Sequence, residues 1–267
     1  MVYREQFNSD LNCYGKLNQV VIIASTGRSG SHMLGHDMIS TGQLGMPFEY
    51  FNQINLNVWK EKFGKHNISE LILDIIKSRT SECSGVFSIK LHYSHIEDIG
   101  IEKIQEMFPN AKYIFIRREN ITKQAISMVI AKQTGKWINN MPGNGVTPSY
   151  SRKLIDLEIK DIIKDNASWI YYLNSNRIDY HEVVFENYLK DPTSEINEIL
   201  RYCGIEESLD TITGRDMKTT QQSNAINGEW YCKYNAERKI NHLFPFRFNK
   251  AIRKMKILLK PIKKVLW

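Results

Sequence analysis

Short apolar runs alternate along the chain with longer stretches that have helical spacing. Apolar residues follow one another without a break at 20–24, and apolar or β-branched residues dominate 85–91, 112–117 and 181–185. A continuous apolar run of this length predicts a strand buried on both faces, as in a parallel sheet. Because helical patterns separate these strands, the chain is expected to fold as βαβ units: an α/β fold with a central parallel sheet flanked by helices.

Between the strands, apolar residues recur every three or four positions, which predicts helices. The expected helices cover residues 31–40, 68–78, 96–108, 120–133, 152–173 and 192–202. Residues 52–65 are expected to form a loop. Residues 137–150 are rich in Asn, Gly and Pro, and they are expected to form a mobile loop that acts as a lid.

The positive charge of the chain is concentrated at its C-terminal end. Net charge is +7, with 36 Lys and Arg against 29 Asp and Glu in 267 residues, yet ten of the basic residues and no acidic residue lie in 238–267. Residues 1–237 therefore have a slight excess of acidic residues, which argues against a nucleic acid as partner. We expect residues 1–237 to form one domain and residues 238–267 to form a separate basic tail.

The pattern within this tail predicts a basic amphipathic helix. Apolar residues at 252, 255, 258, 259, 262, 265 and 266 recur at helical steps, and basic residues fill most other positions. Pro261 is expected to kink the helix. Two interpretations stay open: a helix that packs on the domain, and a peripheral anchor whose cations contact the headgroups of an anionic membrane.

Two features bear on the location of the protein and on metal binding. Residues 1–17 contain charged residues and no apolar run, so we expect neither a signal peptide nor a membrane span there. We therefore expect a cytoplasmic protein that is at most peripherally bound to the inner face of the membrane. The cysteines, Cys13, Cys83, Cys203 and Cys232, form no C-x-x-C pair and are expected to be reduced. No metal ligands stand at a usual spacing, and we expect no metal.

A phosphate-binding turn is indicated directly after the first strand. Residues 25–32 read Ser-Thr-Gly-Arg-Ser-Gly-Ser-His and lead into a predicted helix. Small residues let backbone N–H groups approach an anion, and the helix N-terminus adds partial positive charge. The Lys and the glycine spacing of a Walker A loop are missing, although Arg28 supplies a cation. An ordinary turn whose serines cap the helix is the alternative.

A second element favours the phosphate interpretation. Arg118 follows the strand at 112–117, and Ser127 lies about two turns into the next helix. The carboxyl ends of parallel strands meet at one edge of the sheet, which is where ligands bind in such folds. Arg118 and Ser127 are therefore placed to hold a second phosphate, separate from the one at the first turn.

These residues resemble the two binding elements for 3′-phosphoadenosine 5′-phosphosulfate (PAPS) in sulfotransferases. The sequences of the two motifs are similar to those of the bacterial carbohydrate sulfotransferases typified by trehalose 2-sulfotransferase, which are also described as lipopolysaccharide sulfotransferases. Further segments match that family in order, over roughly residues 20–237; they include residues 47–51, 85–91, 133–137 and 186–192. The resemblance implies a P-loop-like, three-layer α/β fold and transfer of a sulfuryl group from PAPS to a carbohydrate or glycolipid hydroxyl, with no metal.

The resemblance also implies roles for individual residues in donor binding. The residues expected to bind the donor are Thr26, Gly27, Arg28, Ser29, Gly30, Ser31, His32, Arg118, Ser127 and Gln222. Arg28 would also stabilise the charge that develops on the leaving phosphate. His32 stands where the family usually has Thr, and Gln221 where it usually has Arg, so two donor contacts are in doubt; Lys218 is a candidate to replace the second.

Glu49 falls on the family's proposed catalytic glutamate, which would take the proton of the acceptor hydroxyl. Its neighbours Phe48, Tyr50 and Phe51 are expected to desolvate it and raise its pKa. Acceptor-binding candidates are Lys90, His92 and Trp137, of which Trp137 would stack on a sugar ring. Glu186 and Tyr188 are expected to form a structural corner.

Two other functions remain open from the sequence. One is a nucleotide-dependent kinase or phosphotransferase that uses the same loop, although the Walker Lys is missing. The other is a catalytically inactive protein that binds a nucleotide or a glycan. The sequence indicates neither the acceptor hydroxyl nor the oligomeric state.

Overall fold

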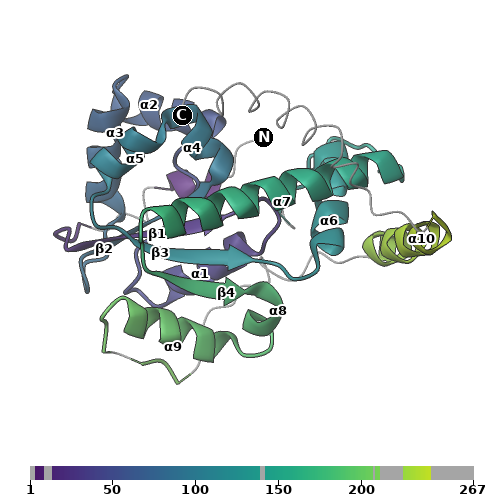
Figure 1. The fold of residues 1–267 in the computed structure, drawn as a ribbon. Coiled ribbons are helices and arrows are strands. Elements are labelled where there is room, and N and C mark those ends of the chain that lie inside the picture. The colour runs from purple at the N-terminus through teal and green to yellow at the C-terminus, as the bar shows by residue number, and fades with distance from the viewer. Residues whose placement is uncertain (1–3, 9–13, 139–141, 207, 211–224, 242–267) are drawn as a thin grey trace, which may run out of the picture.

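The computed structural model describes residues 4–8, 14–138, 142–206, 208–210 and 225–241. Its centre is a sheet of four strands, β1 (Gln19–Ser25), β2 (Val86–His92), β3 (Lys112–Arg117) and β4 (Tyr180–Val184). The strands lie in the order β2-β1-β3-β4, and every neighbouring pair is parallel (Figure 1). The predicted α/β fold with a central parallel sheet is confirmed.

Apolar side chains on both faces explain why these segments form strands. Along β1, Ile22 and Ala24 join one hydrophobic cluster, while Val21 and Ile23 join a second cluster on the opposite face. All four side chains are completely buried. A continuous apolar run is the pattern that such a position in a parallel sheet requires.

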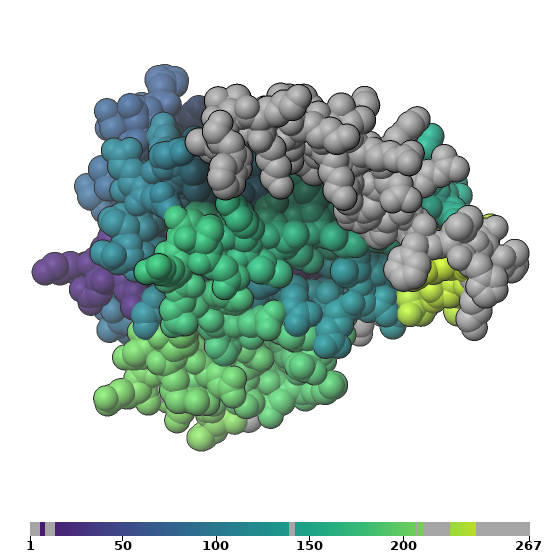
Figure 2. Space-filling model, viewed as in Figure 1, coloured from purple at the N-terminus to yellow at the C-terminus, as the bar shows by residue number. Residues whose placement is uncertain are grey.

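Helices cover both faces of the sheet and make three layers. One face carries α2 (Gln53–Phe63), α3 (Ile68–Arg79), α4 (Tyr93–Ile99), α5 (Ile101–Met107) and α7 (Arg152–Ser175). The other carries α1 (Ser31–Ser40), α8 (Phe185–Tyr188) and α9 (Pro192–Tyr202). In the space-filling view, α7 forms a green band between the blue helices and the lime-green α9 (Figure 2).

A third hydrophobic cluster holds two further helices against α7. Ala125 and Val129 of α6 (Ile121–Thr134) pack with Ile155 and Ile162 of α7, and Trp230 of α10 (Ala225–Asn241) completes the cluster. A short 3-10 helix, η1, covers Arg4–Phe7. Because α6 follows β3, this cluster lies beside the edge of the sheet where the strands end.

Side-chain caps fix where several helices begin. Asn67 accepts hydrogen bonds from backbone N–H groups of α3, and Asn120, Ser151 and Asp191 do the same for α6, α7 and α9. Such caps satisfy N–H groups that have no partner within the helix. They explain why the predicted starts of these helices agree with the structure to within one residue.

The structure differs from the sequence prediction in three helical regions. Residues 96–108 do not form one helix, because Gly100 adopts φ 94° and ψ 136° and separates α4 from α5. Residues 52–65 are not a loop: Asn52 caps α2, and Gly64 ends it in the left-handed conformation. Helix α10 was not predicted, because its apolar face is short and partly aromatic.

Several expectations fall outside the described residues. These are Lys218, Gln221 and Gln222, Cys13 and the tail from residue 242 onward. The expected domain boundary at 237 falls within α10 and stays a prediction, as does the lid at 137–150, whose described residues form neither helix nor strand. Among the described helices, none is long and apolar enough to cross a membrane.

The segment before α2 lies unusually close to β2. Phe48 forms a parallel bridge with Ile89, and the carbonyl of Phe48 accepts a hydrogen bond from the Lys90 N–H at 3.0 Å. Gly45 permits this approach: its φ is +66°, and a Cβ there would lie 2.6 Å from the carbonyl oxygen of Val86. The glycine therefore helps to place the residues that follow, Glu49 among them.

We expect Gly45→Ala to lower the free energy of unfolding by about 1–3 kcal/mol more than Gly64→Ala does. Both glycines have positive φ, so left-handed strain of about 1–2 kcal/mol destabilises the folded state of both variants. At Gly64, however, a Cβ would meet no atom within 4 Å. Urea denaturation of the two variants measures the difference, and equal losses would show that the approach of this segment to β2 does not require glycine.

Candidate functional site

A cavity of about 960 Å³ opens at the edge of the sheet where the strands end. It brings together most of the residues singled out from the sequence: Thr26, Gly27, Arg28, Gly30, Ser31, His32, Glu49, Lys90, His92, Arg118, Ser127 and Trp137. Ser29 is the exception among the described candidates, since its side chain is fully buried and does not line the cavity. Gln222 lies outside the described residues.

The turn after β1 presents backbone N–H groups to this cavity. Gly30 is the N-cap of α1 with φ +101°, and a Cβ there would overlap the ring of Phe185. No side chain caps the helix, so the first N–H groups of α1 are available to an anion, with the partial positive charge of the helix N-terminus behind them. Gly30 is needed because of both its conformation and its contact with Phe185.

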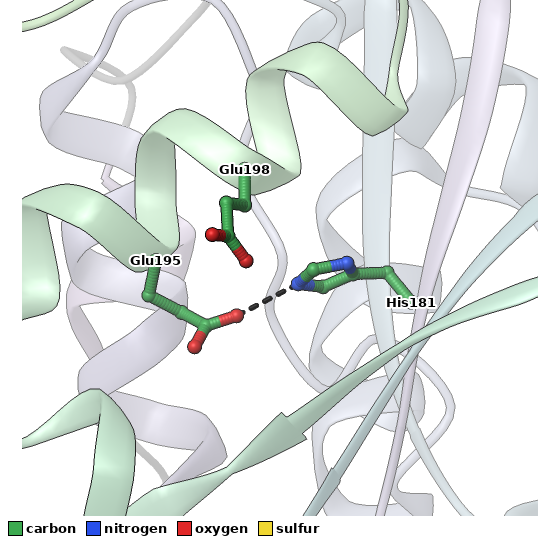
Figure 3. A group of neighbouring side chains, drawn as sticks. All are labelled: His181, Glu195 and Glu198. Carbon is green, nitrogen blue, oxygen red and sulfur yellow. Dashed lines mark hydrogen bonds and ion pairs between the residues drawn. The ribbon is translucent and has the colours of Figure 1, made fainter.

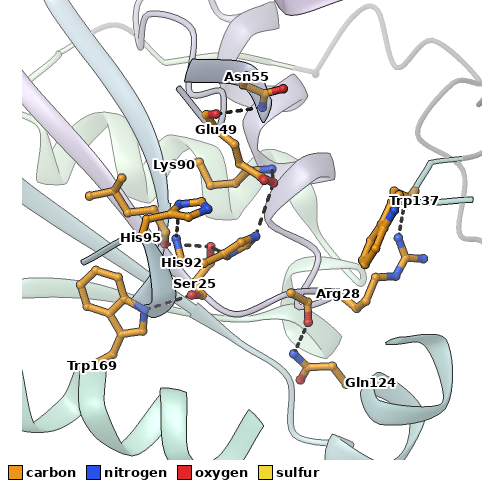
Figure 4. Close-up of polar contacts among 12 residues, drawn as sticks. Ser25, Arg28, Glu49, Asn55, Lys90, His92, His95, Gln124, Trp137 and Trp169 are labelled. Carbon is orange, nitrogen blue, oxygen red and sulfur yellow. Dashed lines mark hydrogen bonds and ion pairs between the residues drawn. The ribbon is translucent and has the colours of Figure 1, made fainter. Parts of the chain in front are cut away.

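Arg28 is held across the cavity by two elements. Its Nε donates to Ser127 Oγ at 2.9 Å. Its guanidinium also donates to the carbonyl of Trp137 (Figure 4). The turn itself is fixed by Gln124 on α6, whose Nε2 donates to Thr26 Oγ1 and to the carbonyl of Gly27, each at 2.8 Å. The predicted first and second phosphate elements are therefore physically joined.

Arg118 is positioned by the residues that follow β4. Its Nε lies 3.6 Å from Glu186 Oε1, and its guanidinium carbon lies 4.7 Å from the centre of the Phe185 ring. Glu186 also accepts hydrogen bonds from the N–H groups of Glu119 and Asn120. Glu186 is thus the structural corner expected from the sequence, as is Tyr188, which donates to buried Asp37.

Two positive charges are forced close together in this half of the cavity. Burial, and then the charge of Arg118, lower the pKa of Arg28 to about 10. Burial also lowers the pKa of Arg118, although Glu186 opposes the shift. Both shifts mean that the charged form is disfavoured by its surroundings, and an anion bound between the two guanidinium groups would offset that cost.

Glu49 lies beside Lys90 and His92 in the other half of the cavity. Its Oε1 is 2.9 Å from Lys90 Nζ and 3.4 Å from His92 Nε2, and its backbone carbonyl accepts a hydrogen bond from Asn55 (Figure 4). Burial alone would raise the pKa of Glu49, but the charge of Lys90 and then the interaction with His92 outweigh it and hold the pKa well below 4.5.

The expectation that aromatic neighbours raise the pKa of Glu49 is therefore wrong. The side chains of Phe48, Tyr50 and Phe51 are buried in the core of the domain, whereas the Glu49 carboxylate faces the cavity beside Lys90. The pKa of the carboxylate therefore follows Lys90, which it contacts, and not the aromatic side chains of its neighbours in sequence.

The other histidines of the cavity are held neutral. Burial, followed by the charges of Lys90 and His36, lowers the pKa of His32 well below 6.5. Burial and then the proximity of His92 lower the pKa of His95 to about 3. His32 is therefore an uncharged hydrogen-bonding group at neutral pH, and its ring packs against that of His36 with centroids 4.5 Å apart.

Helix α7 forms an acidic wall that the sequence analysis did not identify. Glu158, Asp161 and Asp165 line the cavity, and their three- and four-residue spacing places them on one face of the helix. Trp169, one further turn along, donates from Nε1 to the carbonyl of Ser25 at 3.0 Å and so ties α7 to the end of β1. The sequence shows that these three carboxylates share one face of a helix, but it does not show that this face lines the cavity.

A separate group of possible metal ligands lies away from this cavity. His181, near the start of β4, and Glu195 and Glu198, on α9, form the one such group found among the described residues (Figure 3). None of the three lines the cavity. His181 Nε2 lies 2.7 Å from Glu195 Oε1, and this hydrogen bond between the edge strand and α9 accounts for the closeness of these two side chains.

Comparison with solved structures finds sulfotransferase domains of low sequence identity. A domain of the curacin biosynthetic pathway is 13% identical, with 92% of this chain and 99% of that chain covered and a TM-score of 0.49. A domain of the Synechococcus PCC 7002 olefin synthase is 14% identical, with 87% and 90% covered and a TM-score of 0.47. Mouse sulfotransferase SULT7A1, complexed with PAP, is 12% identical, with 89% and 90% covered and a TM-score of 0.47.

No curated protein matches the chain significantly. The family model described as Stf0 sulphotransferase, however, matches residues 20–237, which include all of the sheet except Gln19 and every described residue of the cavity from β1 onward. The chain therefore belongs to the Stf0 sulphotransferase family.

Proposed function

We propose that the protein transfers a sulfuryl group from PAPS to a hydroxyl group of a carbohydrate or glycolipid. The observation that carries this proposal is the division of one cavity into two halves. Arg28, Arg118 and the N-terminus of α1 occupy one half, and an ionised Glu49 beside Lys90 occupies the other. Family membership supports the reaction type.

The residues of the first half fit an anionic donor with phosphates at two positions. The N–H groups of the turn at Thr26–Ser31 and of α1 would bind the 5′-phosphosulfate, and Arg118 with Ser127 would bind the 3′-phosphate. When bound, PAPS supplies the sulfuryl group. Arg28 contacts Ser127 and lies beside Arg118, so it is placed to stabilise negative charge on the phosphate that leaves.

Glu49 would act as the base in the second half. Oε1 faces Lys90 and His92, which leaves Oε2 for the hydroxyl of the acceptor. The low pKa of Glu49 keeps the carboxylate ionised but makes it a weak base. Contact of Lys90 with a sulfonate oxygen would weaken the ion pair and raise the pKa of Glu49, so the base would become stronger when the donor is in place.

The lining of the second half suits a sugar acceptor. Carboxylates of Asp161 and Asp165 and amides of Asn52 and Asn55 line the cavity, and both groups hydrogen-bond hydroxyls well. Trp137, which lines the same cavity beside Arg28, offers a flat apolar surface. A glycolipid acceptor additionally depends on membrane contact through the basic tail, which stays a prediction because the tail lies outside the described residues.

We expect Arg28→Ala and Arg118→Ala each to weaken binding of adenosine 3′,5′-bisphosphate about 10- to 150-fold. Each variant removes a charge-assisted contact worth about 1.5–3 kcal/mol. Isothermal titration calorimetry measures the change. The matched control is Arg117→Ala, since Arg117 is the neighbouring cation but pairs with Glu182 and does not line the cavity.

Binding unchanged within twofold in both cavity variants would refute the assignment of the donor site. Tighter binding of ADP or ATP than of adenosine 3′,5′-bisphosphate to the unmodified chain would favour a kinase or phosphotransferase instead. Both measurements need only the free protein and commercial nucleotides, so they do not depend on knowing the acceptor.

We expect Glu49→Gln to lower kcat about 10²- to 10⁴-fold and to leave donor affinity unchanged within a few-fold, because the amide cannot accept the proton. In the unmodified enzyme, the acid limb of the kcat/KM profile should lie below pH 4.5, since the pKa of Glu49 is held below that value. Steady-state kinetics from pH 3.5 to pH 8 test this. An acid limb near pH 6.5, where an ordinary imidazole titrates, would argue against Glu49.

A further inference from the structure

Ser25, the last residue of β1, contacts the site without lining the cavity. It is completely buried and is the register partner of His92 on β2. Its Oγ lies 3.0 Å from His92 Nδ1 and 3.3 Å from the carbonyl oxygen of Leu91 (Figure 4). A hydroxyl has one hydrogen, so Ser25 donates to only one of these two acceptors at a time.

The contact on the opposite side of the His92 ring indicates which of the two acceptors Ser25 uses. His92 Nε2 lies 3.4 Å from Glu49 Oε1, and Lys90, 2.9 Å from the same oxygen, keeps that carboxylate ionised. An Nε2 without hydrogen would direct its lone pair at a negative charge, whereas an Nε2–H would donate a charge-assisted hydrogen bond. A protonated ring would donate from both nitrogens and leave Ser25 to donate to the Leu91 carbonyl, whereas a neutral ring has one N–H. If that hydrogen is on Nε2, Nδ1 is the acceptor and Ser25 is its donor.

We propose that Ser25 is a positioning residue of the site: its hydroxyl donates to His92 Nδ1 and so keeps the ring proton on Nε2, facing Glu49. The ring is then held at both nitrogens, and it fixes the orientation of the Glu49 carboxylate. Trp169 holds the Ser25 carbonyl, and the His92 N–H donates to His95 Nδ1 at 3.2 Å. The backbone on both sides of the contact is therefore anchored.

Only the effect on turnover rests on the proposed function; the tautomer itself does not. It is measured on the free, full-length chain by long-range ¹H–¹⁵N correlation of the histidine rings, with His92→Gln used to assign the signals. We expect the Nε2–H tautomer in the unmodified protein at neutral pH. An Nδ1–H tautomer, or a ring that carries hydrogens on both nitrogens, would mean that the ring donates to Ser25, and either result would overturn the proposal whatever the activity.

Ser25→Ala removes the donor, and we expect His92 to change from the Nε2–H tautomer to a mixture of both. Ser88→Ala is the matched control. Ser88 is an equally buried serine on β2 whose hydroxyl donates to the carbonyl of Leu44, so its loss removes a buried hydroxyl without touching His92. Retention of the Nε2–H tautomer in Ser25→Ala would refute the proposal even if the unmodified protein shows the expected form.

Activity gives the second readout. We expect Ser25→Ala to lower kcat about tenfold, to leave the KM of the donor unchanged within twofold, and to move the acid limb to higher pH, because a weaker hydrogen bond from His92 lets the pKa of Glu49 rise. The charged and titratable groups around His92 are Glu49, Lys90, His95 and Asp165. An unmoved acid limb would contradict the positioning role, whereas a confirmed tautomer with no sulfuryl transfer would refute only the proposed function.

Discussion

The parallel direction of all four strands is the constraint on which the site depends. It brings the ends of β1, β2, β3 and β4 to one edge of the sheet. Residues more than 150 positions apart in the sequence then meet there: the turn after β1, Lys90 and His92 of β2, Arg118 after β3 and Phe185 after β4 all line one cavity. No local interaction is strong enough to assemble these groups; burial of both faces of the sheet supplies the free energy that holds them in place.

The chain uses this stability to hold charges in unfavourable surroundings. Two arginines lie close together with lowered pKa values, and a carboxylate is held among cations in the opposite half of the same cavity. Charged groups that are partly buried next to like charges cost folding free energy and are typical of functional sites. Binding of an anion between the arginines would lower that cost. The hydrogen bonds that Gln124 donates and Glu186 accepts keep the arginine half in place before any ligand arrives.

The sequence predicted the parts of the fold that follow from local pattern. Buried strands and capped helices were found to within about two residues, because apolar runs and capping side chains act locally. Gly100 and α2 were missed: a single glycine inside a helical pattern does not reveal its φ, and a helix of mixed polarity has no clear period.

The motif residues of the cavity were found, but the direction of the pKa shift at Glu49 was not, since it depends on Lys90 and His92, which are adjacent only after folding. The role of Ser25 and the acidic face of α7 were missed for the same reason.

The central claim is that one cavity holds a sulfuryl donor at its cationic end and a sugar hydroxyl at Glu49. The most direct measurement is incubation of the full-length chain with ³⁵S-labelled PAPS and a panel of neutral mono- and disaccharides, followed by separation of the labelled products. The account predicts that label is transferred to at least one sugar and that the product is stable as a sulfate ester. Absence of transfer to every sugar, together with phosphorylation of a sugar when γ-³²P-labelled ATP replaces PAPS, would contradict it.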